Sequence, residues 1–446
     1  MKNKEKMPQN EISEIKSELL GEKYTFIRHK SGLSIYVYPK NLTTAYAVFG
    51  THYGSIDNGF RLSGDDKATD VPMGIAHFLE HKMFTNADGS DSFERFSALG
   101  ADANAYTSYD KTVYLFSCTS YFKECLRELI KFVTHPYFTE AEVKKEQGII
   151  AEEISMYHDS PSSRSYYGML EGLYHEHDIK SNICGTAESI SKITPELLYR
   201  CHEVFYHPSN MVLAVSGNVN TEDVLSVCDE LLPVTEPKTI IRGGHKEICG
   251  RVKEKSVRKM QHAKPLFDIG IKDTAIPDSA DMRAERDVAM SIVCDLLFSQ
   301  TGELYSRLYE SGLISPSLTS AYTLSETFGF CAVSSETDDP DRVYDIIKEY
   351  VLRCRREGFT EEEFERCRKV FYASFVRGLD SAEDISNDIL EFAFDGYDFF
   401  GYASLILSIT LDRVMEIFRS SFDEDCFTMS VVLPLGGDYK NVGENK

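Results

Sequence analysis

The sequence predicts an α+β fold in which one domain occurs twice. Residues 138–142, FTEAE, return as residues 359–363, FTEEE, and in both copies a threonine stands three residues before a glutamate, a pattern typical of a helix start. Residues 194–216, a helical pattern followed by an apolar strand, return as residues 410–432. Repeats of this kind indicate a duplicated domain. We therefore expect two homologous domains, each built from helices and a sheet.

The chain is long enough for more than one hydrophobic core. It has 446 residues, of which 42% are hydrophobic and 27% charged, proportions typical of a globular protein. We divide it into a flexible or helical N-terminal lead-in, a first domain, a polar linker that contains glycines, and a second domain, at residues 1–22, 23–235, 236–255 and 256–446.

Hydrophobic periodicity predicts the elements in order. Strands are expected as a hairpin at residues 26–37, as paired strands at 104–107 and 112–118, and as core strands at 44–51 and 211–217. Helices are expected at residues 92–99, 121–133, 139–158 and 283–298. Two more are expected, one that begins at Thr194 and another that ends at Leu232. The helix at 139–158 matters most, because it carries several glutamates.

Charge and cysteine content limit the function classes. The net charge of -23 argues against binding to nucleic acid or to anionic membranes. The charge is compatible with an acidic chamber that favours basic peptides, or it serves only solubility. The 11 cysteines are scattered without a C-x-x-C pair, which argues against a disulfide framework. No apolar signal core or membrane-length apolar run is present, so we expect a cytoplasmic protein.

A short segment, residues 71–84, contains the pattern H-x-x-E-H. It is predicted to form a helix that Asp70 caps and that has Pro72 in its first turn. His77 and His81 are four residues apart and share one helix face, a spacing that suits two nitrogen ligands of zinc. Glu80 lies on the same side, where a carboxylate can take a proton from a water at the metal. The alternative is a chance grouping of core or surface side chains.

A catalytic zinc site needs a third protein ligand. Glu146 and Glu153 are seven residues apart in the helix expected at 139–158, so they share a face, whereas Glu152 points away from it. We choose Glu153 as the third ligand. Glu146 is interpreted as a carboxylate that orients a histidine or the water, with a solvated helix face as the alternative.

These motifs resemble those of the insulinase/pitrilysin family of zinc peptidases, which includes the mitochondrial processing peptidases. The family pairs H-x-x-E-H with a downstream E-x6-E and has a glycine followed by an Asn-Ala segment between them. All three features are present, and the resemblance covers the chain from about residue 20 onward. Within the family the sequence is similar to a bacterial YmfH-like group, on the strength of residues 77–84, 145–150 and 304–314.

The resemblance implies two α/β-roll domains, each with a mixed, mostly antiparallel sheet and helices on one face, that together form half of a clamshell. It implies Zn²⁺ as cofactor and a peptide substrate that adds as a further strand along residues 104–107. Side chains of Phe84 and Tyr106 are then candidate substrate contacts, with core packing as the alternative for each. Asn104 and Ala105 complete the candidate substrate-binding set.

The second domain lacks this chemistry. Cys367 and Ser374 stand where Glu146 and Glu153 stand in the first copy. Active members of the family also supply an Arg and a Tyr, spaced R-x6-Y, that hold the substrate carbonyl, whereas this chain has Tyr309 and Ser315 near those places. We therefore expect a heterodimer with a homologous subunit that carries the Arg/Tyr pair, or else a homodimer.

The sequence thus predicts a zinc-dependent endopeptidase subunit that acts on unstructured oligopeptides. The alternative is a non-catalytic or weakly catalytic subunit that assembles or binds peptides in a peptide-processing or protein-modification pathway. An intact set of His77, Glu80, His81 and Glu153 favours the enzyme.

Overall fold

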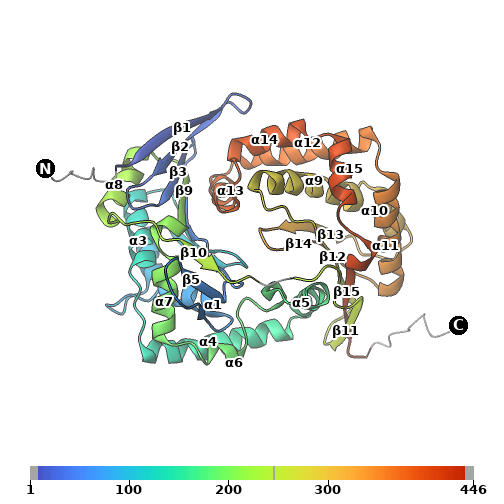
Figure 1. Ribbon diagram of the computed structural model, residues 1–446, viewed down its shortest axis with the longest axis horizontal. Coiled ribbons are helices and arrows are strands. Elements are labelled where there is room, and N and C mark those ends of the chain that lie inside the picture. The colour runs from blue at the N-terminus through green and yellow to red at the C-terminus, as the bar shows by residue number, and fades with distance from the viewer. Residues whose placement is uncertain (1–8, 245–246, 437–446) are drawn as a thin grey trace.

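The computed structural model describes residues 9–244 and 247–436 and shows two halves placed side by side. In Figure 1 the first half runs from blue to green and the second from yellow to red, and each half has its own sheet with helices on its outer side. The α+β fold with two similar domains is therefore confirmed.

The first sheet has seven strands in the order β1-β2-β3-β9-β4-β8-β7. Its only parallel pair in the described chain is β3 with β9, so it is mixed and mostly antiparallel. The central strands β4 and β9 are buried along their whole length, whereas β7 forms an edge. The strands are β1 (Glu11–Ser17), β2 (Glu22–Arg28), β3 (Ser34–Pro39), β4 (Ala45–Thr51), β7 (Asp102–Thr107), β8 (Thr112–Cys118) and β9 (Met211–Gly217).

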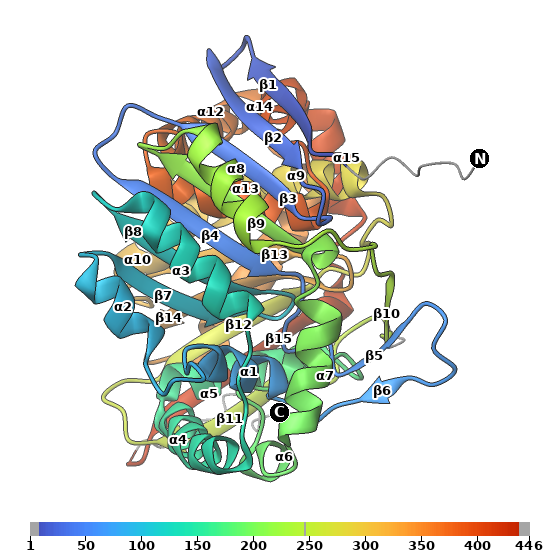
Figure 2. The same cartoon turned by 90° about the vertical axis from the view of Figure 1, so that its left-hand side faces the viewer.

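Helices cover one face of this sheet, as Figure 2 shows. They are α1 (Ile75–Met83), α2 (Ser92–Ala98), α3 (Phe122–Thr134), α4 (Glu140–Asp159), α6 (Ala187–Ile190), α7 (Pro195–Phe205) and α8 (Thr221–Leu231). Side-chain oxygens of Thr139 and Thr194 accept hydrogen bonds at the starts of α4 and α7, as the sequence predicted.

The expected start of α1 is wrong. The helix begins at Ile75 after Gly74, whose φ is 90°, and Asp70 instead belongs to strand β6 (Thr69–Asp70). Gly74 is required here because a Cβ would lie 2.4 Å from the carbonyl oxygen of Cys184. The chain enters α1 from a small sheet that contains Asp70, so Asp70 is held in a strand and does not cap the helix.

Two expectations for the connecting segments also need correction. Residues 11–17 of the predicted flexible or helical lead-in form strand β1, which pairs with β2; residues 1–8 lie outside the described part. The predicted linker contains β10 (Ile240–Arg242), which pairs with β5 (Gly59–Leu62) of the first half.

The second sheet has the order β11-β15-β12-β14-β13. Its parallel pair, β11 with β15, corresponds to β3 with β9 in the first sheet, and Thr360 caps α12 as Thr139 caps α4. The elements are β11 (Lys255–Met260), β12 (Leu266–Lys272), β13 (Thr319–Leu324), β14 (Gly329–Glu336), β15 (Phe427–Pro434), α9 (Ala280–Phe298), α10 (Glu303–Glu310), α11 (Pro340–Glu357), α12 (Glu361–Gly378), α14 (Phe399–Ser408) and α15 (Leu411–Arg419).

Each half gives one helix to the other half's sheet. Helix α5 (Pro161–Leu173) packs on β12 and β15 of the second sheet. Two glycines allow this close approach: a Cβ on Gly168 would lie 2.4 Å from Ser430 Oγ, and a Cβ on Gly172 would lie 2.3 Å from Thr428 Oγ1. The apolar side chains of α5 pack with Phe328 and Phe330.

The reverse contact is made by α13 (Ala382–Asp395), which packs on β4 and β9 of the first sheet. Its Ile389 and Leu390 share a buried cluster with Val48 and Ala214. The Ser386 hydroxyl donates to Ser216 Oγ at 2.9 Å across the same contact. Because each sheet is covered by a helix from the other half, the two halves should unfold together.

The glycine contact of α5 gives a test of this packing. Gly172→Ala should destabilise the protein by about 1–3 kcal/mol, because the threonine it meets is β-branched and held in a strand. Gly148→Ala on α4 is the control: its Cβ would meet nothing within 4 Å, and alanine is the better helix former. Urea unfolding measures both. Equal free energies of unfolding for the two variants would contradict the close packing of α5.

Candidate active site

Three predicted metal ligands come together where α1 faces α4. The imidazole rings of His77 and His81 lie 4.5 Å apart, centroid to centroid. One carboxylate oxygen of Glu153 is 3.7 Å from His77 Nε2, and the other is 3.6 Å from His81 Nε2. One ligand atom from each residue lies within 4.8 Å of the other two. Within the described residues this is the one such group of His, Cys, Asp and Glu side chains.

These residues fit a zinc ion. Nitrogen and oxygen ligands bound at about 2.0–2.2 Å in a tetrahedral site lie roughly 3.3–3.5 Å from one another. The His–Glu separations of 3.6 and 3.7 Å are too long for good hydrogen bonds but close to this spacing. Two imidazoles and one carboxylate also match the donor set of catalytic zinc sites, which leave one position open.

The surroundings of the two histidines shift their pKa values in opposite directions. Burial, together with the neighbouring His81, lowers the pKa of His77 to about 3, so its imidazole is neutral. Around His81 burial opposes the positive charge, but the hydrogen bond to Glu146 and the negative charges of Glu80, Glu146 and Glu153 together outweigh burial and raise the pKa. His81 Nδ1 lies 3.1 Å from Glu146 Oε1. A proton held there by Glu146 leaves Nε2 directed at Glu153.

Glu146 is held in turn by a lysine that the sequence reading did not single out. Lys82 is 1% exposed, and its Nζ lies 3.5 Å from Glu146 and 3.3 Å from Glu142. Burial alone would raise the pKa of Glu146, but His81 and Lys82 lower it, so the carboxylate is charged. The predicted role of Glu146 is to orient a histidine or the water, and its position beside His81 is compatible with the first of these.

Glu80 connects the helix to the edge strand. Its carboxylate is buried and accepts a hydrogen bond of 2.7 Å from the hydroxyl of Thr107, at the end of β7. Burial raises the pKa of Glu80 despite this hydrogen bond. Helix α1 packs against both β7 and α4, and Glu80 and the three candidate ligands line a common space.

That space is a cavity of about 310 Å³. The sequence reading missed several residues that line it. Tyr157 stands one helical turn after Glu153, a spacing that could have identified it. Thr107, which also lines the cavity, ends the strand predicted for the substrate at residues 104–107. Other missed residues come from distant segments, and no local pattern could have found them: Tyr167, Asn182, Ile183 and Cys184. The thiol of Cys184 is 3.9 Å from His77 Nε2.

The candidate substrate-binding residues do not all reach this cavity. Ala105 and Tyr106 line it, and Asn104 lines a second cavity instead. For Phe84 the packing alternative is correct: it is 8% exposed and stacks on Phe93 and Phe132 in the core, with ring centroids 4.0 and 5.1 Å apart. We therefore remove Phe84 from the substrate-binding set.

None of the described residues of the second half lines the cavity of the candidate active site. Tyr309 is 49% exposed on α10 and stacks on Tyr305 with ring centroids 5.7 Å apart. Cys367 and Ser374 lie on α12, far along the chain from the candidate ligands. Tyr309 and Ser315, the residues near the places of the expected Arg/Tyr pair, do not line the cavity that holds the candidate metal ligands.

Comparison with known proteins decides the family. Residues 63–187 match the family described as Insulinase (Peptidase family M16), and residues 192–371 match the Peptidase M16 inactive domain. YmfH of Bacillus subtilis (strain 168), an uncharacterised zinc protease, is 39% identical over 427 residues, which are 95% of this chain and 99% of that protein. The chain belongs to the insulinase family. It is a zinc protease of that family, with a candidate zinc site formed by α1 and α4.

Solved structures of the insulinase family share its fold. An M16-like peptidase from Alicyclobacillus acidocaldarius is similar with a TM-score of 0.87 and 33% identity, covering 95% of this chain and 98% of that one. Pitrilysin has a TM-score of 0.73 at 14% identity, and the match covers 96% of this chain but 47% of pitrilysin. This insulinase-family chain therefore corresponds in fold to about half of pitrilysin. No helix in its described residues is long and apolar enough to span a membrane.

The ligand assignment predicts different metal contents for two adjacent variants. Glu153→Gln should lose most of its zinc, because an amide is a poor ligand and two histidines cannot close the site. Glu152→Gln is the matched control, since Glu152 is exposed and points away from the helix face that carries Glu153. His77→Ala should also lose zinc. Metal analysis of the purified proteins provides the measurement, and full zinc retention in Glu153→Gln would rule out this ligand set.

Proposed function

We propose that this chain is the zinc-bearing subunit of an endopeptidase that hydrolyses unstructured oligopeptides. His77, His81 and Glu153 would hold Zn²⁺, which when bound polarises the peptide carbonyl and lowers the pKa of water. The observation that carries this proposal is the meeting of three ligand atoms within 4.8 Å beside the buried carboxylate of Glu80.

Glu80 is the general base. Its burial raises its pKa, which makes the carboxylate a stronger proton acceptor. It takes a proton from the attacking water and then gives that proton to the amine that leaves when the peptide bond breaks. The hydroxyl of Thr107 fixes the orientation of Glu80, because it donates to one oxygen and leaves the other free for the water.

Glu146 and Lys82 act as positioning residues. Glu146 holds His81 through Nδ1, and Lys82 holds Glu146 through a nearly inaccessible ammonium group. This chain of contacts fixes the ring of His81 before any ion binds, which reduces the conformational freedom lost on binding.

The substrate would add as a strand to the free edge of β7. In the described structure β7 pairs with β8 on one side only, and its residues Ala105 and Tyr106 line the catalytic cavity. Backbone hydrogen bonds along this edge give affinity without requiring a particular sequence, which suits unstructured peptides.

We also propose a partner subunit that supplies the Arg/Tyr pair. Two observations support it: Tyr309 lies away from the catalytic cavity, and the chain matches about half of pitrilysin. A heterodimer with a homologous subunit provides the pair directly, and a homodimer is the alternative. The proposed compartment is the cytoplasm, with all eleven cysteines present as free thiols.

The role of Glu80 can be separated from metal binding. Glu80→Gln should retain zinc and fold, and should lose hydrolysis by about 10²–10⁴-fold, because an amide cannot accept the proton of water. Glu152→Gln serves as control and should retain activity. The assay is hydrolysis of a mixed peptide pool followed by mass spectrometry. If Glu80→Gln cleaves as fast as the unaltered protein, another group must be the base.

The partner proposal predicts a gain in rate on mixing. The chain alone should cleave peptides slowly, and a homologous subunit with R-x6-Y but without H-x-x-E-H should raise the rate about 10–1,000-fold, the size of one or two donors to the developing oxyanion. The pool is assayed with each protein alone and with both. A rate for this chain alone that equals the rate of the mixture would exclude the heterodimer as the active form.

A further inference from the structure

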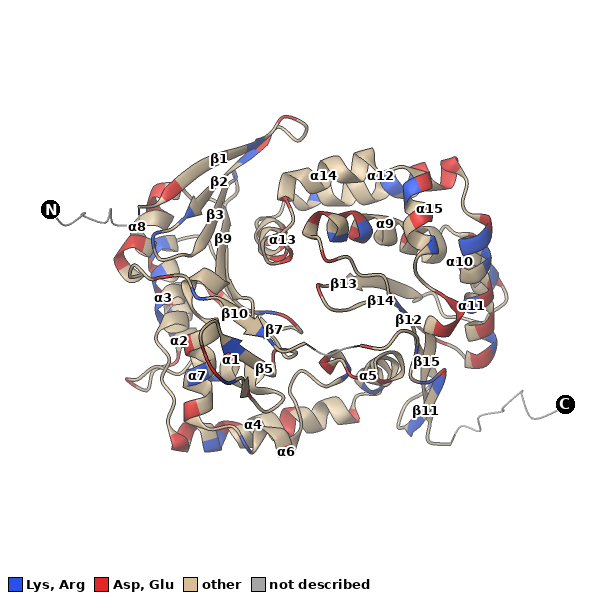
Figure 3. Cartoon of the chain, in the orientation of Figure 1, with Lys and Arg blue, Asp and Glu red and all other residues tan. Residues whose placement is uncertain are grey.

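Three tyrosines line the cavity of the candidate active site: Tyr106, Tyr157 and Tyr167. A hydrogen-bond donor in such a cavity accelerates peptide hydrolysis, because the oxygen of the scissile carbonyl becomes negative when water adds to its carbon. None of the described Lys and Arg residues lines the cavity. In Figure 3 the Lys and Arg positions of α10, α11 and α15 lie on the opposite side of the molecule from α1 and α4. A donor from the cavity wall is then most simply a hydroxyl or an amide.

The position of Tyr157 in α4 brings it next to the candidate ligands. It stands four residues after Glu153, so the two side chains share one helix face. Long side chains of a helix lean toward its N-terminal end, which directs the ring of Tyr157 back over the turn that carries Glu153. The half-buried ring also packs against the core of the first half. Tyr157 is thus anchored by its ring where it lines the cavity.

The acidic groups of the candidate active site act on the hydroxyl of Tyr157. Burial and the nearby Cys184 raise the pKa of this phenol. The carboxylates of Glu153 and Glu80 raise the pKa further, and Glu153 does so in part through a hydrogen bond. The phenol therefore keeps its proton at neutral pH and can donate a hydrogen bond. Its hydroxyl is within the influence of both the general base and the third candidate ligand.

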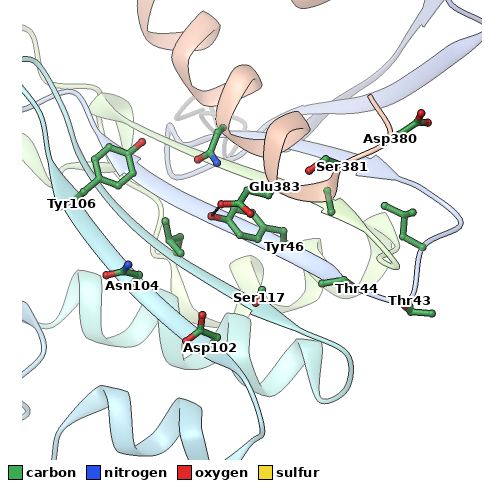
Figure 4. Close-up of a pocket in the computed structure, with 14 residues that line it drawn as sticks. Thr43, Thr44, Tyr46, Asp102, Asn104, Tyr106, Ser117, Asp380, Ser381 and Glu383 are labelled. Carbon is green, nitrogen blue, oxygen red and sulfur yellow. Dashed lines mark hydrogen bonds between the residues drawn. The ribbon is translucent and has the colours of Figure 1, made fainter. Parts of the chain in front are cut away.

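Two other hydroxyls of the cavity are engaged elsewhere. The hydroxyl of Thr107 donates its proton to Glu80. Tyr106 also lines the second cavity, which lies toward α13 (Figure 4). After burial, the main group that raises the pKa of Tyr106 is the carboxylate of Glu391, which belongs to α13. The hydroxyl of Tyr106 is therefore associated with α13 rather than with the candidate metal ligands.

The third tyrosine and the amide of Asn182 are held by the loop before α6. The hydroxyl oxygen of Tyr167 accepts a hydrogen bond of 3.4 Å from the N–H of Ile183. Burial and then Cys184 raise the pKa of Tyr167, without a contribution from the carboxylates of the candidate active site. Asn182 Oδ1 accepts a hydrogen bond of 2.8 Å from the N–H of Cys184, which holds this carboxamide on its own loop. These comparisons single out the hydroxyl of Tyr157.

We propose that Tyr157 is a catalytic residue that donates a hydrogen bond to the oxygen of the scissile carbonyl as this oxygen becomes negative. The inference rests on the proposed function and adds a donor from this chain to the Arg/Tyr pair of the partner. The water oxygen bonds to the carbonyl carbon, the π electrons of the C=O bond move to the carbonyl oxygen, and Glu80 takes one water proton. When the C–N bond breaks, the C=O bond forms again and Glu80 gives that proton to the amine. The second water proton leaves with the product acid, and Tyr157 keeps its own proton throughout.

The contact between Tyr157 and Glu153 is compatible with this role. A hydroxyl rotates about its C–O bond, so its proton can be directed at either of two neighbouring acceptors. Glu153 is a weaker acceptor when it binds a cation, since part of its negative charge is then neutralised. The carbonyl oxygen gains charge only as the reaction proceeds, so a hydrogen bond to it is stronger in the transition state than in the bound substrate. Such an interaction raises the rate of the chemical step.

The test compares the binding of two peptides that differ only at the scissile bond. One carries a phosphinic group in place of the scissile amide, which resembles the tetrahedral state with its negative oxygen. The other is the plain peptide, measured in the Glu80→Gln background so that it is not cleaved. Tyr157→Phe keeps the packed ring and removes only the hydroxyl. It should bind the phosphinic peptide about 10–100-fold more weakly and the plain peptide within about twofold, with unchanged zinc content.

Two further variants control for the loss of a hydroxyl as such. Tyr167→Phe removes a second hydroxyl from the same cavity and should weaken binding of the phosphinic peptide much less than Tyr157→Phe does. Tyr309→Phe removes a hydroxyl from an exposed residue outside the cavity and should leave both affinities unchanged. Equal losses in Tyr157→Phe and Tyr167→Phe, or equal losses for the two peptides, would overturn the assignment. Loss of zinc from Tyr157→Phe would also overturn it, because Tyr157 would then act by positioning Glu153.

Failure of this inference and failure of the proposed function give different results. If the unaltered protein binds the phosphinic peptide more tightly than the plain one and Tyr157→Phe keeps that difference, Tyr157 is not the donor and the peptidase remains. If the unaltered protein neither cleaves the plain peptide nor binds the phosphinic peptide more tightly, alone or with the homologous partner, the catalytic proposal is wrong and the role of Tyr157 is excluded with it.

Discussion

The exchange of α5 and α13 between the two sheets is the contact on which the rest of the molecule depends. Helix α4 ends at Asp159, and Ser160 both ends it and caps α5, so the two helices join without a flexible segment. Because α5 is fixed on the second sheet through its glycines, the end of α4 that carries Glu153 is fixed as well. The second half thus supports a candidate metal centre to which none of its described residues gives a ligand.

The candidate site is also joined to the strand that would hold the substrate. The hydrogen bond from Thr107 to Glu80 links the end of β7 to the general base, and Lys82 and Glu146 link the other face of α1 to α4. These contacts run through side chains that are mostly buried, where polar interactions are stronger than in water. Movement of the edge strand would therefore displace Glu80 before it displaced the three candidate ligands.

Sequence reading placed the candidate ligands well because helical spacing is local. Four residues separate His77 from His81 and seven separate Glu146 from Glu153, and those spacings fix helix faces whatever the tertiary contacts are. The pairing of the two helices came from the resemblance to a family. Features that depend on distant contacts were missed: Asp70 is taken into a small sheet, and Cys184 approaches His77 from a separate loop. The same limit applies to the side chain of Phe84, whose burial depends on α2 and α3.

The order of synthesis gives the helix exchange a further meaning. The first sheet is complete once β9 ends at Gly217, but the helix that covers its other face spans Ala382–Asp395, close to the C-terminus. Helix α5 in turn must wait for β15, which begins at Phe427. On the ribosome the first half therefore carries two uncovered apolar surfaces until α13 and β15 have emerged, so the candidate site gains these supporting contacts long after its own residues are made.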